Sequence, residues 1–183
     1  MRRRLLLVAA LLAGCASAPP KAGGLPALRL PPAALGSTRL ALTQRLSVTR
    51  LDAPDVPPQR VDMQLQLDAS GLLLAGFAFS QRVLLMQWDG KDLSVQRHPM
   101  LPGEVDTDHM LRDLCLTYWP AEAVRAALPD GWRWVDTAEG QSLEQAGEAR
   151  LVVRRPAANI IEIVNRAEGY RLLIESQPSE ASS

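Results

Sequence analysis

Residues 40–49 read LALTQRLSVT, and residues 61–68 read VDMQLQLD. In both stretches apolar and polar side chains alternate, which is the two-residue period of a β-strand with one buried face. The segment between them, residues 51–59, contains three prolines and is typical of a loop. The sequence therefore predicts two long strands, each with one face toward a core.

Strand patterns continue along most of the chain. Residues 72–79 and 83–88 are apolar on nearly both faces, which predicts strands covered on two sides, and Asp89-Gly90 predicts a tight hairpin after them. Further strands are expected at residues 93–95, 132–136, 151–155, 159–164 and 170–175. About nine strands follow from these patterns.

A helical insertion interrupts the strands. Four apolar residues fall on one side of a helix that Asp106 or Thr107 can cap, and Pro120 opens a second helix over residues 121–128. The four apolar residues are Met110, Leu111, Leu114 and Cys115. This order predicts a mainly β (α+β) fold, a curved antiparallel sheet or incomplete barrel with the helices packed on its concave side.

The amino terminus has the layout of a secretory signal peptide. Three arginines precede an apolar run of about ten residues, which is roughly half of what a membrane-spanning helix needs. Leu12-Ala13-Gly14-Cys15 then matches the bacterial lipobox, whose cysteine accepts a diacylglycerol. We therefore expect cleavage before Cys15 and acylation there, with palmitate as a typical chain. The alternative is an ordinary secreted protein that is cut at another site.

The expected organisation is a lipid-anchored single domain. We predict a signal peptide at 1–14, a Pro-, Ala- and Gly-rich lipidated tether at 15–37, one half-barrel domain at 38–176 and a disordered tail at 177–183. Ala16 stands where retention at the inner membrane prefers Asp, which favours the periplasmic face of the outer membrane.

Composition excludes a polyanion-binding protein. The chain has 20 basic and 20 acidic residues, and removal of Arg2, Arg3 and Arg4 leaves 17 basic against 20 acidic, a net charge of −3. The remaining basic residues are scattered among acidic ones, so we expect no nucleic-acid partner. Of the two cysteines, only Cys115 remains once Cys15 is acylated, which excludes an intrachain disulfide in the mature chain.

No arrangement typical of an active site stands out, and we predict that the protein is not an enzyme. His98 and His109 lack the spacing of a zinc-binding pair, and no Gly-x-Ser-x-Gly motif occurs. Glu104, Asp106, Asp108 and Asp113 could share a cation or proton with His109. The simpler interpretation is stronger, because Asp106 and Asp108 fall where a helix begins and negative charge is favoured there. We expect no metal, no cofactor and no catalytic residue, and we interpret Cys115 as a buried, inert thiol.

Large aromatic and sulfur-containing side chains suggest a lipid-lined groove, although an ordinary core is the competing interpretation. The expected wall of this pocket comprises Leu42, Leu46, Met63, Leu65, Phe77, Phe79, Trp88, Met110, Leu114, Trp132 and Trp134.

Residues 116–120, LTYWP, with the following helix and Gly131-Trp132, resemble an uncharacterised family of short bacterial lipoproteins classed as a domain of unknown function. Gly76-Phe77 and residues 170–172 fit the same pattern, and the resemblance covers about residues 38–176. Members are often encoded beside fatty-acid-like or aryl polyene synthesis genes, which implies a role in lipid export.

The order of strands and helices is also similar to the carrier and receptor fold of the Lol pathway, an incomplete barrel around an acyl-binding cavity. In the membrane-anchored Lol receptor a loop with an exposed aliphatic side chain assists the handover of lipoproteins. By this resemblance Leu51 and Val56 would form a loop that contacts the membrane or a partner, and envelope transport proteins would be partners.

These observations lead to one functional expectation and one alternative. We expect an outer-membrane lipoprotein that binds acyl or polyene lipid, or lipoprotein acyl chains, in a hydrophobic cavity and assists their transfer or insertion. The alternative is a structural or assembly lipoprotein that binds a protein partner in the envelope and has no lipid pocket. A hydrolase is disfavoured because no nucleophile and base can be recognised.

Overall fold

The computed structural model describes residues 24–101 and 105–179. The predicted signal peptide and Cys15 lie outside the described residues. Within the described part, no helix is long and apolar enough to cross a bilayer.

Ten antiparallel strands form one sheet in the order β5-β4-β3-β2-β1-β10-β9-β8-β7-β6. The strands are β1 (Leu40–Arg50), β2 (Gln59–Asp68), β3 (Gly71–Ala78), β4 (Gln81–Trp88), β5 (Leu93–Arg97), β6 (Trp132–Thr137), β7 (Gly140–Gln145), β8 (Glu148–Ala157), β9 (Ile160–Asn165) and β10 (Tyr170–Pro178). The helices are the 3-10 turn η1 (Pro32–Leu35), α1 (Thr107–Tyr118) and α2 (Ala121–Ala127). The prediction of a mainly β protein with inserted helices is confirmed.

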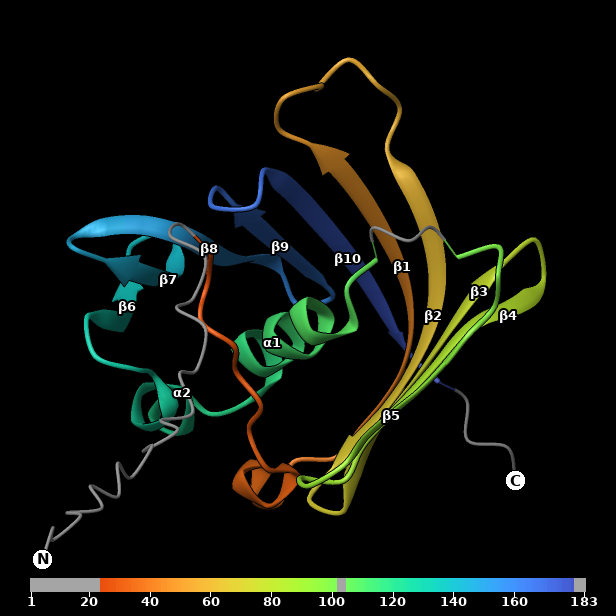
Figure 1. Cartoon of the computed structure of the whole chain (residues 1–183), viewed down its shortest axis with the longest axis horizontal. Helices are drawn as coiled ribbons and strands as arrows, with labels where there is room; N and C mark the ends of the chain where they lie inside the picture. The colour runs from red at the N-terminus through yellow and green to blue at the C-terminus, as the bar shows by residue number, and fades with distance from the viewer. Residues whose placement is uncertain (1–23, 102–104, 180–183) are drawn as a thin grey trace, which may run out of the picture.

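The sheet curves without closing, and β5 and β6 form its two edges. Helix α1 lies against the concave face, and α2 lies beside β6 (Figure 1). Asp106 caps α1, because its carboxylate accepts hydrogen bonds from the backbone N–H groups of Asp108 and His109 at 2.8 and 3.2 Å. The chain connecting the two edges therefore fills the inside of the curve.

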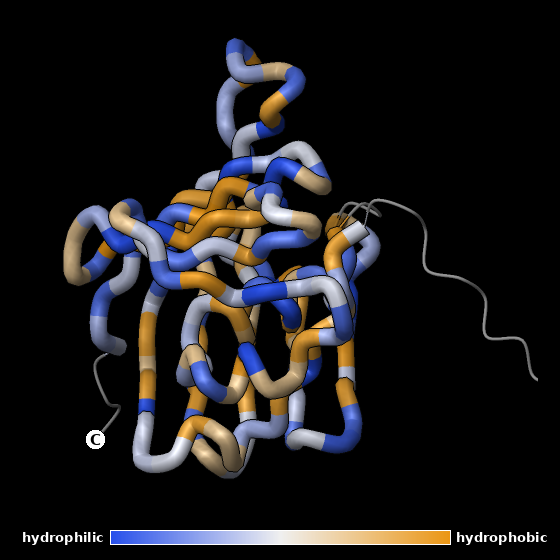
Figure 2. Tube along the Cα trace, turned by 90° about the vertical axis from the view of Figure 1, so that its left-hand side faces the viewer, coloured by the Kyte–Doolittle hydropathy of each residue, from blue (hydrophilic) through white to orange (hydrophobic). Residues whose placement is uncertain are grey.

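The apolar positions of the alternating sequence line up across neighbouring strands and form a row of side chains that point inward. Leu42, Leu65, Leu74, Met86 and Val95 are register partners on five successive strands, β1 to β5. All five lie in the core or pack against it, and complete burial of such side chains stabilises the fold by about 1.5–3 kcal/mol each. Figure 2 shows the same alternation as apolar segments along the strands, with polar residues frequent in the connecting loops.

The structure differs from the predicted elements at two places. Strand β7 was not predicted, because its sequence GQSLEQ is polar and carries little strand signal. The expectation that residues 72–79 and 83–88 are covered on two sides is wrong. Outward-facing Leu73 and Leu85 are partly exposed, since both helices lie on the concave side.

Residues 24–35, which we call the N-terminal strap, pack into the domain, whereas residues 15–37 were expected to be a tether. Leu28, Leu30 and Leu35 are buried in the core. The indole N–H of Trp88 donates to the Leu30 carbonyl at 2.8 Å, and the indole N–H of Trp119 donates to the Pro31 carbonyl at 3.0 Å. At the other end of the chain, β10 continues to Pro178, into the expected tail.

The burial of the N-terminal strap leads to a prediction about the stability of the fold. Replacing Leu30, which is 4% exposed, with Ala leaves a cavity between the strap and the core, and we expect a loss of about 2–5 kcal/mol in the free energy of unfolding. Urea denaturation measures the loss. Leu51→Ala is the matched control, because Leu51 is 41% exposed and should change stability by less than about 0.5 kcal/mol. Equal effects of the two substitutions would show that the strap is not part of the fold.

Candidate functional site

Nine residues of the expected pocket wall lie on the concave side. They belong to the core cluster or pack against it, and they are Leu42, Leu46, Met63, Leu65, Trp88, Met110, Leu114, Trp132 and Trp134. Met63, Leu65, Trp88 and Trp134 are buried, while the other five remain partly exposed. The structure therefore brings these nine residues together around α1, where they pack as core.

Phe77 and Phe79 lie elsewhere, and the expectation that they share the concave wall is wrong. Phe77 is the register partner of outward-facing Asp62, so its side chain lies on the convex face. Phe79 follows the end of β3 and is 88% exposed. A register shift between Gly76 and Phe77 affects the pairing of β3 with β4, whereas the pairing of β3 with β2 stays regular through Phe77.

A cluster of charged and polar side chains binds α1 to the turn between β9 and β10. Arg112 is 1% exposed and donates two hydrogen bonds to the carboxylate of Glu168, at 2.6 and 2.8 Å. Its Nε donates to Asp113 at 2.9 Å, and the hydroxyl of Tyr170 donates to the other oxygen of Asp113. Asn165 donates to Glu168 at 2.9 Å. The hydrogen-bonding capacity of the buried guanidinium is thus largely used within this Arg112 cluster.

Burial and ion pairing shift the pKa values of Asp113 and Arg112 in opposite directions. Burial raises the pKa of Asp113 above its ordinary value, against the influence of the neighbouring Arg112. For Arg112, burial favours the neutral form, but the hydrogen bonds to Glu168 and the charge of Asp113 outweigh it, so its pKa is raised. Burial, followed by the charge of Asp113, raises the pKa of Tyr170. The guanidinium therefore stays charged, and the tyrosine stays a hydroxyl donor.

A second polar group lies under the end of α1. The side-chain amide of Gln44 donates to the hydroxyl of Tyr118 at 2.7 Å and to that of Ser176 at 2.8 Å. Cys115 lies on the buried side of the same helix, and burial raises its pKa to about 12, so the thiol is protonated at neutral pH. The hydrogen bonds of Gln44 connect the end of α1 to the sheet, and the protonated thiol of Cys115 is not a nucleophile.

The convex face carries a hollow of about 750 Å³ over β1, β2, β3 and β10, near the end of the sheet where the loop between β1 and β2 lies. Ser47 and Thr49 of β1 line it together with longer side chains of the neighbouring strands, including Arg60, Phe77 and Leu173. A second hollow, of about 410 Å³, lies at the opposite end of β2 to β5. The larger hollow was not predicted, because its members come from four strands whose register the sequence does not reveal.

Sequence reasoning also missed the Arg112 cluster. From the sequence, no role is assigned to Arg112 and Asp113 counts only as one of several neighbouring carboxylates, whereas α1 buries both residues. No local signal distinguishes this arginine from an exposed one. Only the turn at Glu168 supplies the anion that makes its burial tolerable.

Within residues 24–101 and 105–179, no three histidine, cysteine or carboxylate side chains come together as metal ligands would. The described protein is thus a single open antiparallel sheet wrapped around one helix, with a buried ionic cluster and a hollow on its outer face.

Comparison with known proteins places the chain in a family. It belongs to the family described as Protein of unknown function (DUF3261), whose sequence profile matches residues 41–178. The match begins at the second residue of β1 and ends with the last residue of β10, so it covers the whole sheet. The resemblance to an uncharacterised family is confirmed at this level. A comparison with curated proteins finds no match.

The ion pairs of the buried Arg112 lead to a second prediction about stability. Arg112→Met leaves Glu168 and Asp113 without their cation, and we expect a loss of about 3–5 kcal/mol in the free energy of unfolding at neutral pH. Arg45→Met is the control, because Arg45 pairs with Asp62 on the surface, where both side chains are more than half exposed, and should cost less than about 1 kcal/mol. Chemical denaturation of both variants checks this, and a loss as small as that of the control would contradict it.

The raised pKa of Asp113 leads to a prediction about how stability depends on pH. Because its pKa is raised in the folded state, the folded protein binds more protons than the unfolded chain, and the contribution of Asp113 to stability falls as pH rises through the folded pKa. The nearly isosteric Asp113→Asn removes this dependence. We expect the stability of the wild type relative to Asp113→Asn to be highest in acid and to decrease toward neutral pH.

Denaturation curves of both proteins between acid and neutral pH measure this difference. Asp92→Asn, at an exposed carboxylate in the β4–β5 turn, controls for the loss of one charge. A difference that stays constant, or that grows with pH, would contradict the prediction.

Proposed function

We propose that this protein is an envelope lipoprotein, anchored through Cys15 at the periplasmic face of the outer membrane. It binds acyl or polyene chains on the concave side of a Lol-like half-barrel, between the sheet and α1, and assists their transfer or insertion. The proposal involves no covalent chemistry and no cofactor. The observation that carries it is the position of the exposed apolar side chains.

Four large apolar residues are prominently exposed in the described part of the chain, and all lie at one end of the sheet. Leu51 and Val56, 41% and 59% exposed, belong to the loop between β1 and β2. Phe79, 88% exposed, lies in the turn from β3 to β4, and Met100, 51% exposed, follows β5. Because alternate strands run in opposite directions, these three connections meet at the same end. We call Leu51, Val56, Phe79 and Met100 the apolar rim.

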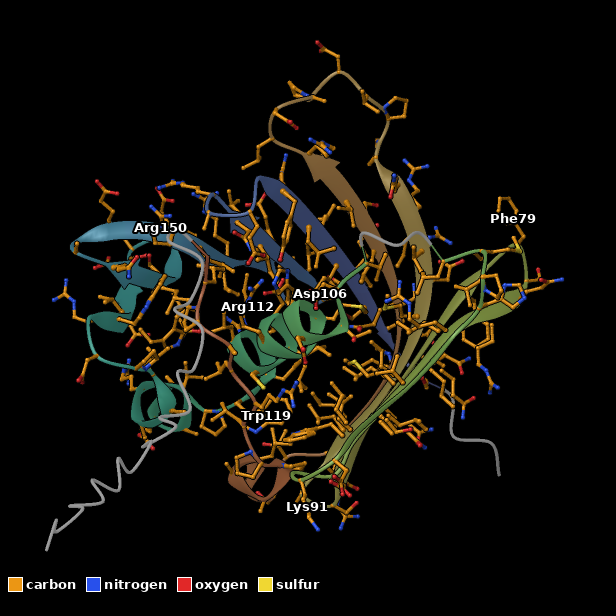
Figure 3. The ribbon with its side chains drawn as sticks, in the orientation of Figure 1. Phe79, Lys91, Asp106, Arg112, Trp119 and Arg150 are labelled. Atoms are coloured by element: carbon orange, nitrogen blue, oxygen red, sulfur yellow. The ribbon has the colours of Figure 1, made fainter. Side chains whose placement is uncertain are left out.

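The opposite end of the same strands is polar. Its β2–β3 turn is closed by the carboxylate of Asp68, which accepts from Ser70. Its β4–β5 turn is closed by Asp89, which accepts from the backbone of Lys91 and Asp92. Figure 3 shows Phe79 and Lys91 at the two ends of the sheet. A concentration of apolar side chains at one end is typical of a surface that meets lipid or another protein.

The apolar rim borders a concave face that is incompletely buried near this end. Leu46 of β1 and Val61 of β2 are register partners that point inward and remain partly exposed. Met110 and Leu114 of α1 also pack on the core while remaining partly exposed. An acyl chain placed between these residues would gain about 0.8 kcal/mol for each methylene that leaves water. This supports entry of a lipid chain from the rim.

The competing function is binding of a protein partner in the envelope. The proline-rich loop Leu51–Pro58 favours it, because a preformed loop with exposed apolar residues also suits a protein interface. The two functions differ in what accompanies the purified protein: an acyl-containing lipid in one case, and a protein without lipid in the other.

Native mass spectrometry with lipid extraction tests the proposal on the full chain expressed in a Gram-negative host. We expect one noncovalent acyl or polyene ligand per protein. Val61→Phe adds bulk to the concave side and should lower occupancy by about tenfold, equivalent to roughly 1.4 kcal/mol. Leu85→Phe on the convex face is the matched control and should leave occupancy unchanged. A protein that arrives empty and captures none of the offered lipids would overturn the lipid-binding function.

A further inference from the structure

We propose that the hollow on the convex face is a separate binding site for a single-chain anionic amphiphile, a free fatty acid. It holds the carboxylate at Arg60 and the chain beside Phe77 and Leu173. The site goes beyond the concave-side binding proposed above and does not depend on it. It rests on the register of four strands, on the arginines of the hollow and on its size.

The register places small hydroxyl side chains between long ones. Ser47 of β1 is the partner of Arg60 on β2 and of Leu173 on β10, so these three side chains form one outward row. Thr49 lies two residues farther along β1 and also lines the hollow. The short side chains of Ser47 and Thr49 leave the space that the longer neighbours enclose. The floor can therefore donate hydroxyl hydrogen bonds to an anion.

One of the three arginines that line the hollow has no carboxylate partner in the part of the chain that the structure describes. Arg45 bonds to Asp62 at 3.2 Å and is also the register partner of Glu175, so two carboxylates flank it. Arg171 bonds to Glu162 at 2.6 Å. The side chain of Arg60 makes no hydrogen bond or ion pair within the described residues. Arg60 is therefore the arginine of this hollow whose guanidinium is available to bind a ligand.

A carboxylate matches a single free guanidinium better than a phosphate does. It carries one negative charge at neutral pH and accepts two parallel hydrogen bonds from a guanidinium. A phosphate monoester carries about 1.5 to 2 negative charges and would leave part of them uncompensated. The hollow therefore favours an acid of the fatty-acid type.

Apolar side chains lie next to Arg60 and give the chain of such an acid a surface. Phe77 is the partner of Asp62, which is two residues from Arg60 along β2, and Phe79 continues in the same direction. Phe79 and Ser80 occupy a two-residue turn with φ of 50° and 62°, a left-handed conformation that usually requires Asn or Gly. The strained turn holds the aromatic ring at the border of the hollow. The volume of about 750 Å³ lies in the range of small-ligand sites, about 300–1,000 Å³.

Calorimetric titration of the full chain with sodium dodecanoate, below its micelle concentration, tests the site. We expect one dodecanoate to bind at the hollow of each protein, apart from any acyl chain on the concave side. Dodecan-1-ol and acetate should each bind there at least about tenfold more weakly, because the alcohol lacks the charge and acetate lacks the chain. Arg60→Gln should weaken dodecanoate by about tenfold and leave dodecan-1-ol unchanged. Arg166→Gln, at an exposed arginine of the β9–β10 turn, is the matched control and should change neither.

Amide chemical shifts recorded during the same titration locate the ligand. Shifts centred on Ser47, Thr49 and Leu173 support the site. Shifts confined to Met110 and Leu114 and their neighbours would overturn it while supporting binding on the concave side. Shifts at both places would support both sites, so the two proposals fail separately. Equal affinity for dodecanoate and dodecan-1-ol, an unchanged affinity of Arg60→Gln, or acetate as strong as dodecanoate would each also overturn it.

Discussion

Covering the concave face is the physical constraint on which this structure depends. An open sheet of ten strands has two faces, and both helices of the described chain lie on one of them. The apolar rows of β1 to β5 are buried only while α1 and the N-terminal strap stay in place. The Arg112 cluster and the indole hydrogen bonds of Trp88 and Trp119 hold these two segments. The fold is therefore fixed by contacts between segments far apart in sequence.

This arrangement separates the two faces of the sheet chemically. The inner face is apolar and is occupied largely by the protein's own side chains, with partial exposure toward the apolar rim. The outer face is polar and charged, and small residues of β1 open a hollow there. The rim joins both faces, because Phe79 belongs to it and also borders the hollow. A ligand arriving at this end can reach either face.

The candidate site was only partly predictable. Leu42, Met63 and Leu65 were assigned to the inner face by their alternation, and the structure places them there. Phe77 and Phe79 were assigned wrongly, because the sequence of β3 is apolar on both faces and its alternation does not show which face is turned inward. Apart from the adjacent Asp113, the partners of Arg112 are Glu168 and Tyr170, which lie 56 and 58 positions away in sequence. Such pairs become visible only when strands β9 and β10 are placed against α1.

The sequence by itself determined the strand periods, the helical insertion after β5, the cap at Asp106 and the inert character of Cys115, because these follow from local spacing and side-chain chemistry. The tertiary structure alone decided which charges are buried together, that residues 24–35 belong to the core, and where the outer hollow lies. The physical reason is that burial and ion pairing depend on neighbours from distant strands. Their register is set when the whole sheet curves around α1.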